Sequence, residues 1–172
     1  MLFNSIEYIF FFFPAVFFFI KLLNYKNNII LIKIIFILAS LFFYSYWNIK
    51  FLPLILISVL GNLFFIKFLA KEKKNLFFQI LFNIVLLFTF KYTDFTITQI
   101  NYLFDKNIGL LEMAFPLALS FFTFQQISSA VDLFQRKKNI KIIDYFLYVT
   151  FFPQLIAGPI VLLEHFEKQI KN

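Results

Sequence analysis

The sequence predicts an all-α integral membrane protein, a polytopic helical bundle of about five to six transmembrane or re-entrant segments. Of its 172 residues, 62% are hydrophobic and only 15% are charged, against about 45–50% and about 25% in a soluble domain. The apolar residues also form runs near the length of about 20 residues that one bilayer crossing requires. This composition excludes a soluble enzyme, a disordered tail and a coiled coil, and the absence of cysteine excludes disulfides and thiolate metal sites.

The first half of the chain contains four apolar segments of crossing length: Ile6–Leu23, Ile29–Trp47, Phe51–Leu69 and Leu76–Tyr92. Pro14 predicts a kink in the first segment, which a membrane helix tolerates. Lys33 lies one turn into the second segment, so its side chain is expected to reach the interface. The fourth segment carries Gln79 and Asn83, which a spacing of four residues places on one helix face.

The pattern changes after the fourth segment. The stretch Thr93–Met113 is too polar to span the membrane, whereas Ala114–Phe134 is long enough to cross but carries many polar side chains. The last apolar run, Ile142–Leu163, contains Pro153, Gly158 and Pro159, which are expected to break the helix in its second half. With no linker and no internal repeat, residues 1–172 are expected to form a single membrane domain.

Basic residues alternate between the connecting loops and predict an orientation. They are concentrated at residues 21–26, 67–74 and 136–141, after the first, third and fifth segments, whereas Lys50 is the only basic residue between the second and third. Positive charge is retained on the cytoplasmic side of a membrane. We therefore expect a multi-pass protein of the bacterial inner (cytoplasmic) membrane whose N-terminus is extracytoplasmic.

The fifth segment is polar on two sides. On a helix of 100° per residue, Gln125, Ser128, Ser129 and Asp132 share one arc, and Ser120, Thr123 and Gln126 share an opposite arc. Such a helix cannot face lipid on both sides. Two interpretations stay open: the polar side chains either make hydrogen bonds that pack the helix against its neighbours, or they line a wet cavity.

The stretch FFPQLIAGPI, residues 151–160, is the sharpest local feature of the sequence. Non-helical backbone at membrane depth persists only where it is buried in protein or lines a water-filled space. Gln154 lies at this break, with an amide that both donates and accepts hydrogen bonds. The simpler alternative is a proline-kinked helix.

No catalytic residue and no metal site is predicted from the residues themselves. His165 is the only histidine, but it lies in a polar tail beside Glu164, Glu167 and Lys168, where a solvated role is expected. The sequence contains no nucleophile elbow, phosphate-binding loop or HExxH motif. This reasoning predicts a polar interior near residues 120–160 and assigns it no chemistry.

Five phrases follow one another in an order that resembles the N-terminal part of the bacterial membrane-bound O-acyltransferases. They are MLFNSIEYIFFFFPAVF (Met1–Phe17), FFYSYWNIKFLPLILIS (Phe42–Ser58), FKYTDF (Phe90–Phe95), PLALSFFTFQQISSAVDLF (Pro116–Phe134) and DYFLYVTFFPQLIAGPI (Asp144–Ile160). The branch that is most similar is the membrane subunit of alginate and peptidoglycan O-acetylation systems. The resemblance extends over nearly the whole chain.

The resemblance implies an acyltransferase that forms part of the cell envelope machinery. It would take an acyl group, in this branch acetyl, from a cytoplasmic thioester such as acetyl-CoA, and pass it through a tunnel to hydroxyls of an extracytoplasmic polysaccharide, directly or through an extracytoplasmic acyltransferase partner. No nucleic acid partner is expected. The candidate tunnel-lining residues are Gln125, Gln126, Asp132, Pro153, Gln154, Gly158 and Pro159.

The family's catalytic histidine lies beyond the matching part, so His165 does not inherit that role. Because acyl transfer to a hydroxyl needs a base within hydrogen-bond reach, the chain is expected to be an N-terminal fragment or truncated product of an acyltransferase that is inactive alone. The alternative is a non-enzymatic membrane module, either half of a transporter or an assembly partner.

Overall fold

The structure is a computed structural model that describes residues 3–24, 28–69, 72–112, 114–137, 139–155 and 158–171. Helices make up nearly all of this part, and no strand occurs in it, which confirms the all-α prediction. In chain order they are η1 (Glu7–Phe12), α1 (Phe13–Asn24), α2 (Ile29–Trp47), η2 (Ile49–Phe51), α3 (Leu52–Phe64), η3 (Phe65–Leu69), α4 (Lys73–Lys91), α5 (Thr93–Phe104), α6 (Leu119–Arg136), α7 (Ile142–Thr150), α8 (Phe152–Leu155) and α9 (Leu163–Lys171).

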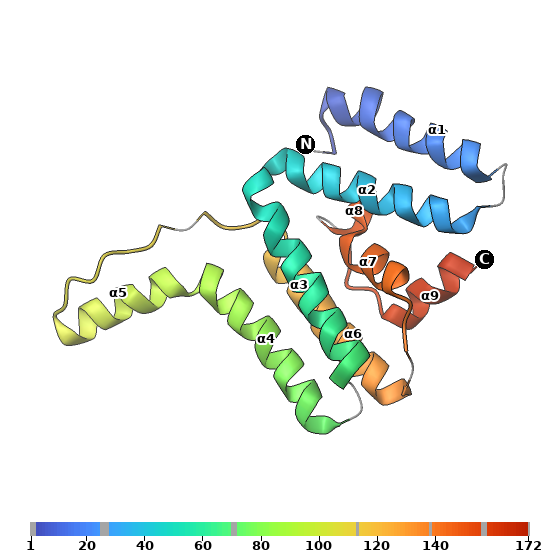
Figure 1. Ribbon diagram of the computed structural model, residues 1–172. Coiled ribbons are helices and arrows are strands. Elements are labelled where there is room, and N and C mark those ends of the chain that lie inside the picture. The colour runs from blue at the N-terminus through green and yellow to red at the C-terminus, as the bar shows by residue number, and fades with distance from the viewer. Residues whose placement is uncertain are drawn as a thin grey trace.

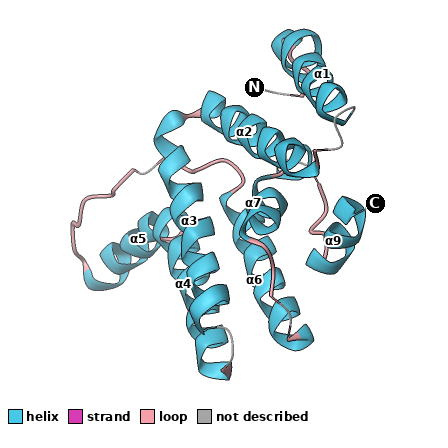
Figure 2. Cartoon of the chain, turned by 45° about the vertical axis from the view of Figure 1, so that its right-hand side comes forward, coloured by secondary structure: helices cyan, strands magenta, loops and turns pink. Residues whose placement is uncertain are grey.

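The helices form two groups that cross each other (Figure 1). The first is the antiparallel pair α1 and α2, and the second contains α3, α4 and α6, which run away from the end of α2. The short helices α7 and α8 pack against α2, and α9 packs against α6 and α7. Helix α5 projects from the end of α4, and an extended segment leads back to α6 (Figure 2).

Three spans in the described part are long and apolar enough to cross a membrane: Ile29–Trp47, Ile49–Phe68 and Lys73–Lys91. They match the second, third and fourth predicted segments. The first predicted segment is helical too, but it changes from the π-helix η1 to α1 just before Pro14. A π-turn widens the helix where proline would otherwise clash with the preceding turn.

Two boundaries differ from the sequence prediction. The predicted segment Ala114–Phe134 is helical only from Leu119, because Pro116 and the left-handed residue Ala118 (φ 57°) delay the start of α6. The polar stretch after α4 contains the regular helix α5. Three of its threonine hydroxyls donate to the carbonyl group four residues earlier, from Thr93, Thr96 and Thr98.

The core lies where α3, α6 and α7 meet. Ile55, Val59, Phe122 and Tyr145 are almost completely buried there. A second, aromatic cluster joins η1 to α2 and α8, in which the rings of Phe12 and Phe152 meet edge to face at 5.2 Å. Many phenylalanines of η1 and α1, together with Phe42 of α2, remain exposed, as on a lipid-facing surface.

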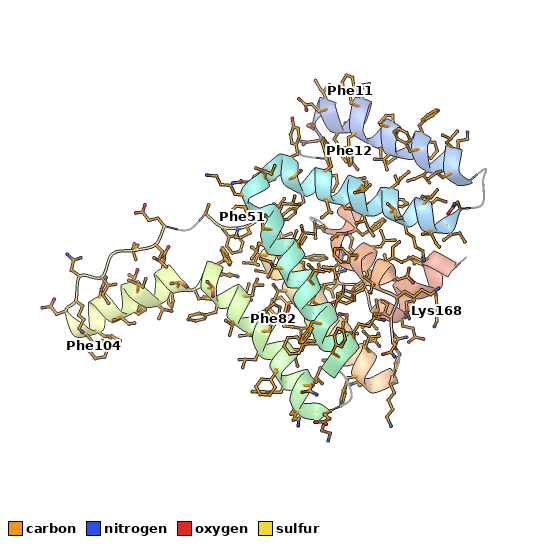
Figure 3. All side chains as sticks on the ribbon, viewed as in Figure 1. Phe11, Phe12, Phe51, Phe82, Phe104 and Lys168 are labelled. Carbon is orange, nitrogen blue, oxygen red and sulfur yellow. The ribbon has the colours of Figure 1, made fainter. Side chains whose placement is uncertain are left out.

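Helices α3 and α4 approach closely at Gly61. The ring of Phe82 lies between the two helices (Figure 3), and a Cβ atom on Gly61 would lie 2.6 Å from its Cζ atom. A side chain at this position would therefore displace the Phe82 ring. This contact places the polar residues of α3 and α4 opposite each other.

Candidate functional site

The candidate site is the polar interior around α6. Four of its polar side chains are buried: Thr123, Gln125, Gln126 and Ser129. They lie on both sides of the helix, so neither of the two predicted polar arcs is fully exposed. The other polar positions of the two predicted arcs, Ser120, Ser128 and Asp132, are partly buried.

Gln126 connects α6 to α3 and α7. Its Nε2 donates to the hydroxyl of Ser58 in α3 at 2.7 Å, and its Oε1 accepts from the hydroxyl of Tyr145 in α7 at 3.5 Å. Ser129, one turn further along α6, donates its hydroxyl to the carbonyl oxygen of Gln126 at 2.8 Å. Each of these contacts satisfies a group that lies away from solvent.

A cluster of three amide side chains joins α3 to α4, and we call Asn62, Gln79 and Asn83 the amide cluster. Asn62 Nδ2 donates to Asn83 Oδ1 at 3.0 Å, and Asn83 Nδ2 donates back to Asn62 Oδ1 at 2.7 Å. The same Asn62 oxygen accepts from Gln79 Nε2 at 3.0 Å. The prediction that Gln79 and Asn83 share one helix face is confirmed, since both are buried here.

Sequence reasoning missed Ser58 and Asn62, the partners of these residues in α3. A signal was present, because the two are spaced four residues apart in an otherwise apolar segment, as Gln79 and Asn83 are in the next one. Two such pairs on consecutive helices predict an interhelical polar contact. Periodicity alone did not show which faces of the two helices meet.

The predicted break after α7 is confirmed, and side chains hold its non-helical backbone. Phe151 leaves the helical region (φ −52°, ψ 104°), and the freed amide of Phe152 donates to Ser40 Oγ in α2 at 3.1 Å. The hydroxyl of Tyr148 donates to the carbonyl oxygen of Val161 at 2.8 Å, and Gln154 Nε2 donates to that of Pro159 at 2.9 Å. The alternative of a simple proline-kinked helix is therefore wrong.

Gly158 is required by its contact with Gln154. A Cβ atom on Gly158 would lie 2.5 Å from Cγ and 2.8 Å from Cα of Gln154. We call residues 151–155 and 158–160 the broken segment. Its backbone at Gly158 consequently lies directly against Gln154, the residue that binds Pro159. Pro153 and Pro159 themselves are exposed, and Gln154 is buried.

Gln125 retains one unused acceptor. Its Nε2 donates to the carbonyl oxygen of Tyr148 at 2.9 Å, whereas its Oε1 is buried without a hydrogen-bond partner. A buried acceptor of this kind costs free energy unless a donor reaches it. The orphaned oxygen lies on the helix that the sequence assigns to the polar interior.

Charged groups hold the basic ends of the helices. Arg136 contacts Asp132 at 2.7 Å within α6 and Glu167 of α9 at 3.3 Å. Lys33 binds Asp144 at 2.6 Å, with 14% and 17% of the two side chains exposed. The start of α7 thus places a carboxylate beside Lys33, and the expectation that this side chain reaches the interface stays a prediction.

The groups gathered in this interior are mainly amides and hydroxyls. Amides and hydroxyls supply donors and acceptors near neutral pH, and His165 lies exposed on α9, as expected for a solvated residue. Within the described ranges, no three His, Asp or Glu side chains come together as metal ligands. A cavity of about 10 Å³, the size of one water molecule, lies between η3, α4 and α6 beside Gln79 and Ala130.

The chain is similar to bacterial O-acetylating enzymes along its whole length. It is 35% identical to a peptidoglycan O-acetyltransferase of Helicobacter pylori, with 100% of this chain and 39% of the relative aligned. It is 27% identical to a "Probable alginate O-acetylase AlgI" of Pseudomonas syringae and 25% identical to one of Pseudomonas aeruginosa, covering 100% of this chain and 35% of each relative. The chain thus spans little more than a third of the length of these relatives.

No protein-family profile matches the chain. No solved structure matches it either.

Proposed function

This chain belongs to the bacterial membrane-bound O-acyltransferase family, and from that premise we propose that it supplies the early helices of an O-acetyltransferase. The observation that carries the proposal is the match along the whole of this chain to relatives named for two different acceptors, peptidoglycan and alginate. What those names share is the transfer of an acetyl group to a hydroxyl. A polysaccharide of the cell envelope is therefore the proposed class of acceptor.

The finer proposal concerns donor and direction. The acetyl group would come from a cytoplasmic thioester such as acetyl-CoA and would reach an extracytoplasmic glycan, directly or through an extracytoplasmic acyltransferase partner. The protein would lie in the inner membrane with its N-terminus outside, because the basic loops follow the first, third and fifth predicted segments. The catalytic base would come from outside the matched third of the enzyme.

Within such an enzyme, we propose that this chain forms part of the lining of the tunnel through which the acyl group passes. Gln125, Gln126 and Asp132 of α6 and Pro153, Gln154, Gly158 and Pro159 of the broken segment are the proposed lining residues. The orphaned Oε1 of Gln125 supports this assignment, since a buried acceptor without a donor costs free energy that packing alone does not explain. The non-helical backbone beside Gln154 supports it as well.

The test is a chimera in which residues 1–172 replace the matching part of the Helicobacter pylori relative. It is expressed in a strain that lacks its own O-acetyltransferase, and the acetate released from purified peptidoglycan by mild base is measured. We expect acetate above the vector control. The intact relative sets the upper limit, and a chimera carrying an unrelated set of membrane helices sets the background.

Gln154→Ala and Asp132→Ala in that chimera test the lining assignment. Both should lower acetylation without lowering the amount of protein in the membrane fraction, whereas Gln99→Ala, on the exposed α5, should leave it unchanged. A well-inserted chimera that acetylates no better than the background contradicts the enzymatic proposal and favours a non-enzymatic membrane module. Normal acetylation in both site variants would leave those side chains with a packing role only.

A further inference from the structure

We propose that the groove between η1–α1 and α2 binds one phospholipid whose headgroup carries a primary ammonium. We call it the aromatic groove, and it is lined by Glu7, Phe11, Phe12, Ala15, Phe42 and Tyr46. None of these residues belongs to the polar interior around α6. The inference is therefore independent of the proposed acetyl transfer.

The aromatic groove has the size and lining of a ligand site. Its volume is about 400 Å³, within the range of about 300–1,000 Å³ that is usual for small-molecule pockets. Four of its six lining residues are aromatic, and Ala15 leaves the space between them open. An apolar chain is the ligand part that such a lining favours.

The floor of the groove is fixed by the protein core. Phe12 stacks on Phe42 with ring centroids 6.0 Å apart and 14° between the planes, and Phe42 contacts Tyr46 at 6.5 Å. Phe12 is only 8% exposed because its other neighbours are Phe43 and Phe152. The groove consequently exists before a ligand enters it, which lowers the cost of binding.

Polar groups are placed at one end of the groove. Glu7 opens η1 and Tyr46 lies in the last turn of the antiparallel α2, so both occur at the same end of the helix pair, where Figure 3 labels Phe11 and Phe12. An exposed carboxylate attracts an ammonium and repels a net anionic headgroup. The Tyr46 hydroxyl can donate to a phosphate oxygen.

The surroundings of the groove point to a membrane lipid. The helices η1 and α1 that form one side of it carry further exposed phenylalanines, including Phe10, Phe17 and Phe18, and α2 is one of the candidate membrane spans. Tyr46 and Trp47 at the end of that span are typical of headgroup depth. A ligand with its chain among the phenylalanines and its headgroup at Glu7 and Tyr46 is a phospholipid, and Glu7 selects the ammonium-bearing kind.

The test uses the full chain in detergent micelles that contain equal amounts of phosphatidylethanolamine and phosphatidylglycerol, with native mass spectrometry counting the lipids retained. We expect one retained phosphatidylethanolamine, preferred about fivefold, a factor that corresponds to about 1 kcal/mol. Glu7→Gln should reduce the preference to about one. Ala15→Phe should fill the groove and remove the retained lipid, whereas Leu60→Phe, at an exposed position of α3, should not.

Three results would overturn the proposal. The first is equal retention of both lipids by the wild-type chain, which would make the groove a place for any lipid. The second is unchanged lipid retention in Ala15→Phe, which would place the lipid elsewhere. The third is a dimer in the mass spectrum that Ala15→Phe dissociates, which would show that a second copy of the chain fills the groove. Each variant must show the helix content of the wild type by circular dichroism. If Ala15→Phe does not, Ala15→Leu is used in its place.

Discussion

Asn62 is the residue on which the contact between α3 and α4 depends. Its Nδ2 donates both to Asn83 and to the carbonyl oxygen of Ser58, and its Oδ1 accepts from Gln79 and Asn83. All four groups are buried. In a lipid environment the hydrophobic effect does not drive helices together, so contacts of this kind carry a larger share of the packing.

Replacing Asn62 by leucine should lower the free energy of unfolding by about 1–2 kcal/mol, because it leaves Gln79 and Asn83 without their partner. Asn83→Leu should have a similar effect. The double variant should lose less than the sum of the two, since each single change leaves the other asparagine without its partner and the double variant removes both. The measurement is denaturant unfolding in mixed micelles, followed by helix circular dichroism.

Thr89→Val is the control for this series, because the Thr89 hydroxyl bonds only within its own exposed helix face. It should unfold like the wild type. Strict additivity of the two asparagine variants would contradict the reciprocal contact.

A second prediction at the residue scale concerns Gly158. A methyl group there would meet both the side chain and the backbone of Gln154, and overpacking of this kind costs about 1–3 kcal/mol. Gly158→Ala should therefore lower the melting temperature of the chain in detergent. Gly109→Ala, where nothing lies within 4 Å of the added atom, should leave it unchanged, and equal melting of the two variants would refute the close approach.

Among the elements, α2 and α7 show how distant parts of the chain are held in register. Lys33 pairs with Asp144 near the start of both helices, and Ser40 binds the amide of Phe152 just after the end of α7. The two helices consequently lie side by side and run in the same direction. This arrangement positions the broken segment, because its backbone begins at the Ser40 contact.

Lys33→Ala should lower the free energy of unfolding by more than the ion pair itself contributes, because it leaves the largely buried Asp144 carboxylate without its cation. We expect a loss of about 2 kcal/mol for Lys33→Ala and a smaller loss for the double variant Lys33→Ala/Asp144→Ala. Unfolding in mixed micelles measures both. Lys74→Ala, which breaks the exposed pair with Glu72, should cause no measurable change in stability. A double variant less stable than Lys33→Ala would contradict the cost of leaving Asp144 unpaired.

The sequence predicts those helices whose length and apolar composition are set by crossing the lipid bilayer. Apolar runs of crossing length fixed α2, α3 and α4, and the prolines located the break after α7. Helix α5 was not predicted because a crossing criterion ignores short polar helices. Its position depends on contacts outside the helix, where Asp94 accepts from the Leu111 amide and Asn101 binds both backbone groups of Ile108.

The polar interior was predictable as a region but not as a set of contacts. The two arcs of α6 predicted that this helix either packs within protein or lines a wet cavity, and Gln154 was found from its place among proline and glycine. The Ser58–Gln126 and Lys33–Asp144 contacts join residues that are 68 and 111 positions apart. Periodicity specifies which residues share a face of one helix, whereas the choice of partner is decided by how the helices fold together.

For the whole molecule, packing restricts the possible orientations. The small cavity beside Gln79 is lined by Ile66 of η3, Leu76 of α4 and Leu133 of α6. The end of the third predicted segment, the start of α4 and the end of α6 therefore lie at one level, as Figure 1 shows. The basic residues after the third and fifth predicted segments must then face the same side of the membrane.

Reporter fusions test this orientation together with the positive-inside prediction. Green fluorescent protein inserted after Glu72 or after Lys137 should fluoresce, and alkaline phosphatase at either site should be inactive, because both sites are expected in the cytoplasm. Alkaline phosphatase inserted after Asn48, between α2 and α3, should be active. Active alkaline phosphatase at both basic sites would mean that the protein has the opposite orientation in the membrane, with the packing of its helices unchanged. Opposite results at those two sites would contradict the shared level of η3, α4 and α6, since these elements cannot contact one another as they do while ending on different faces of the bilayer.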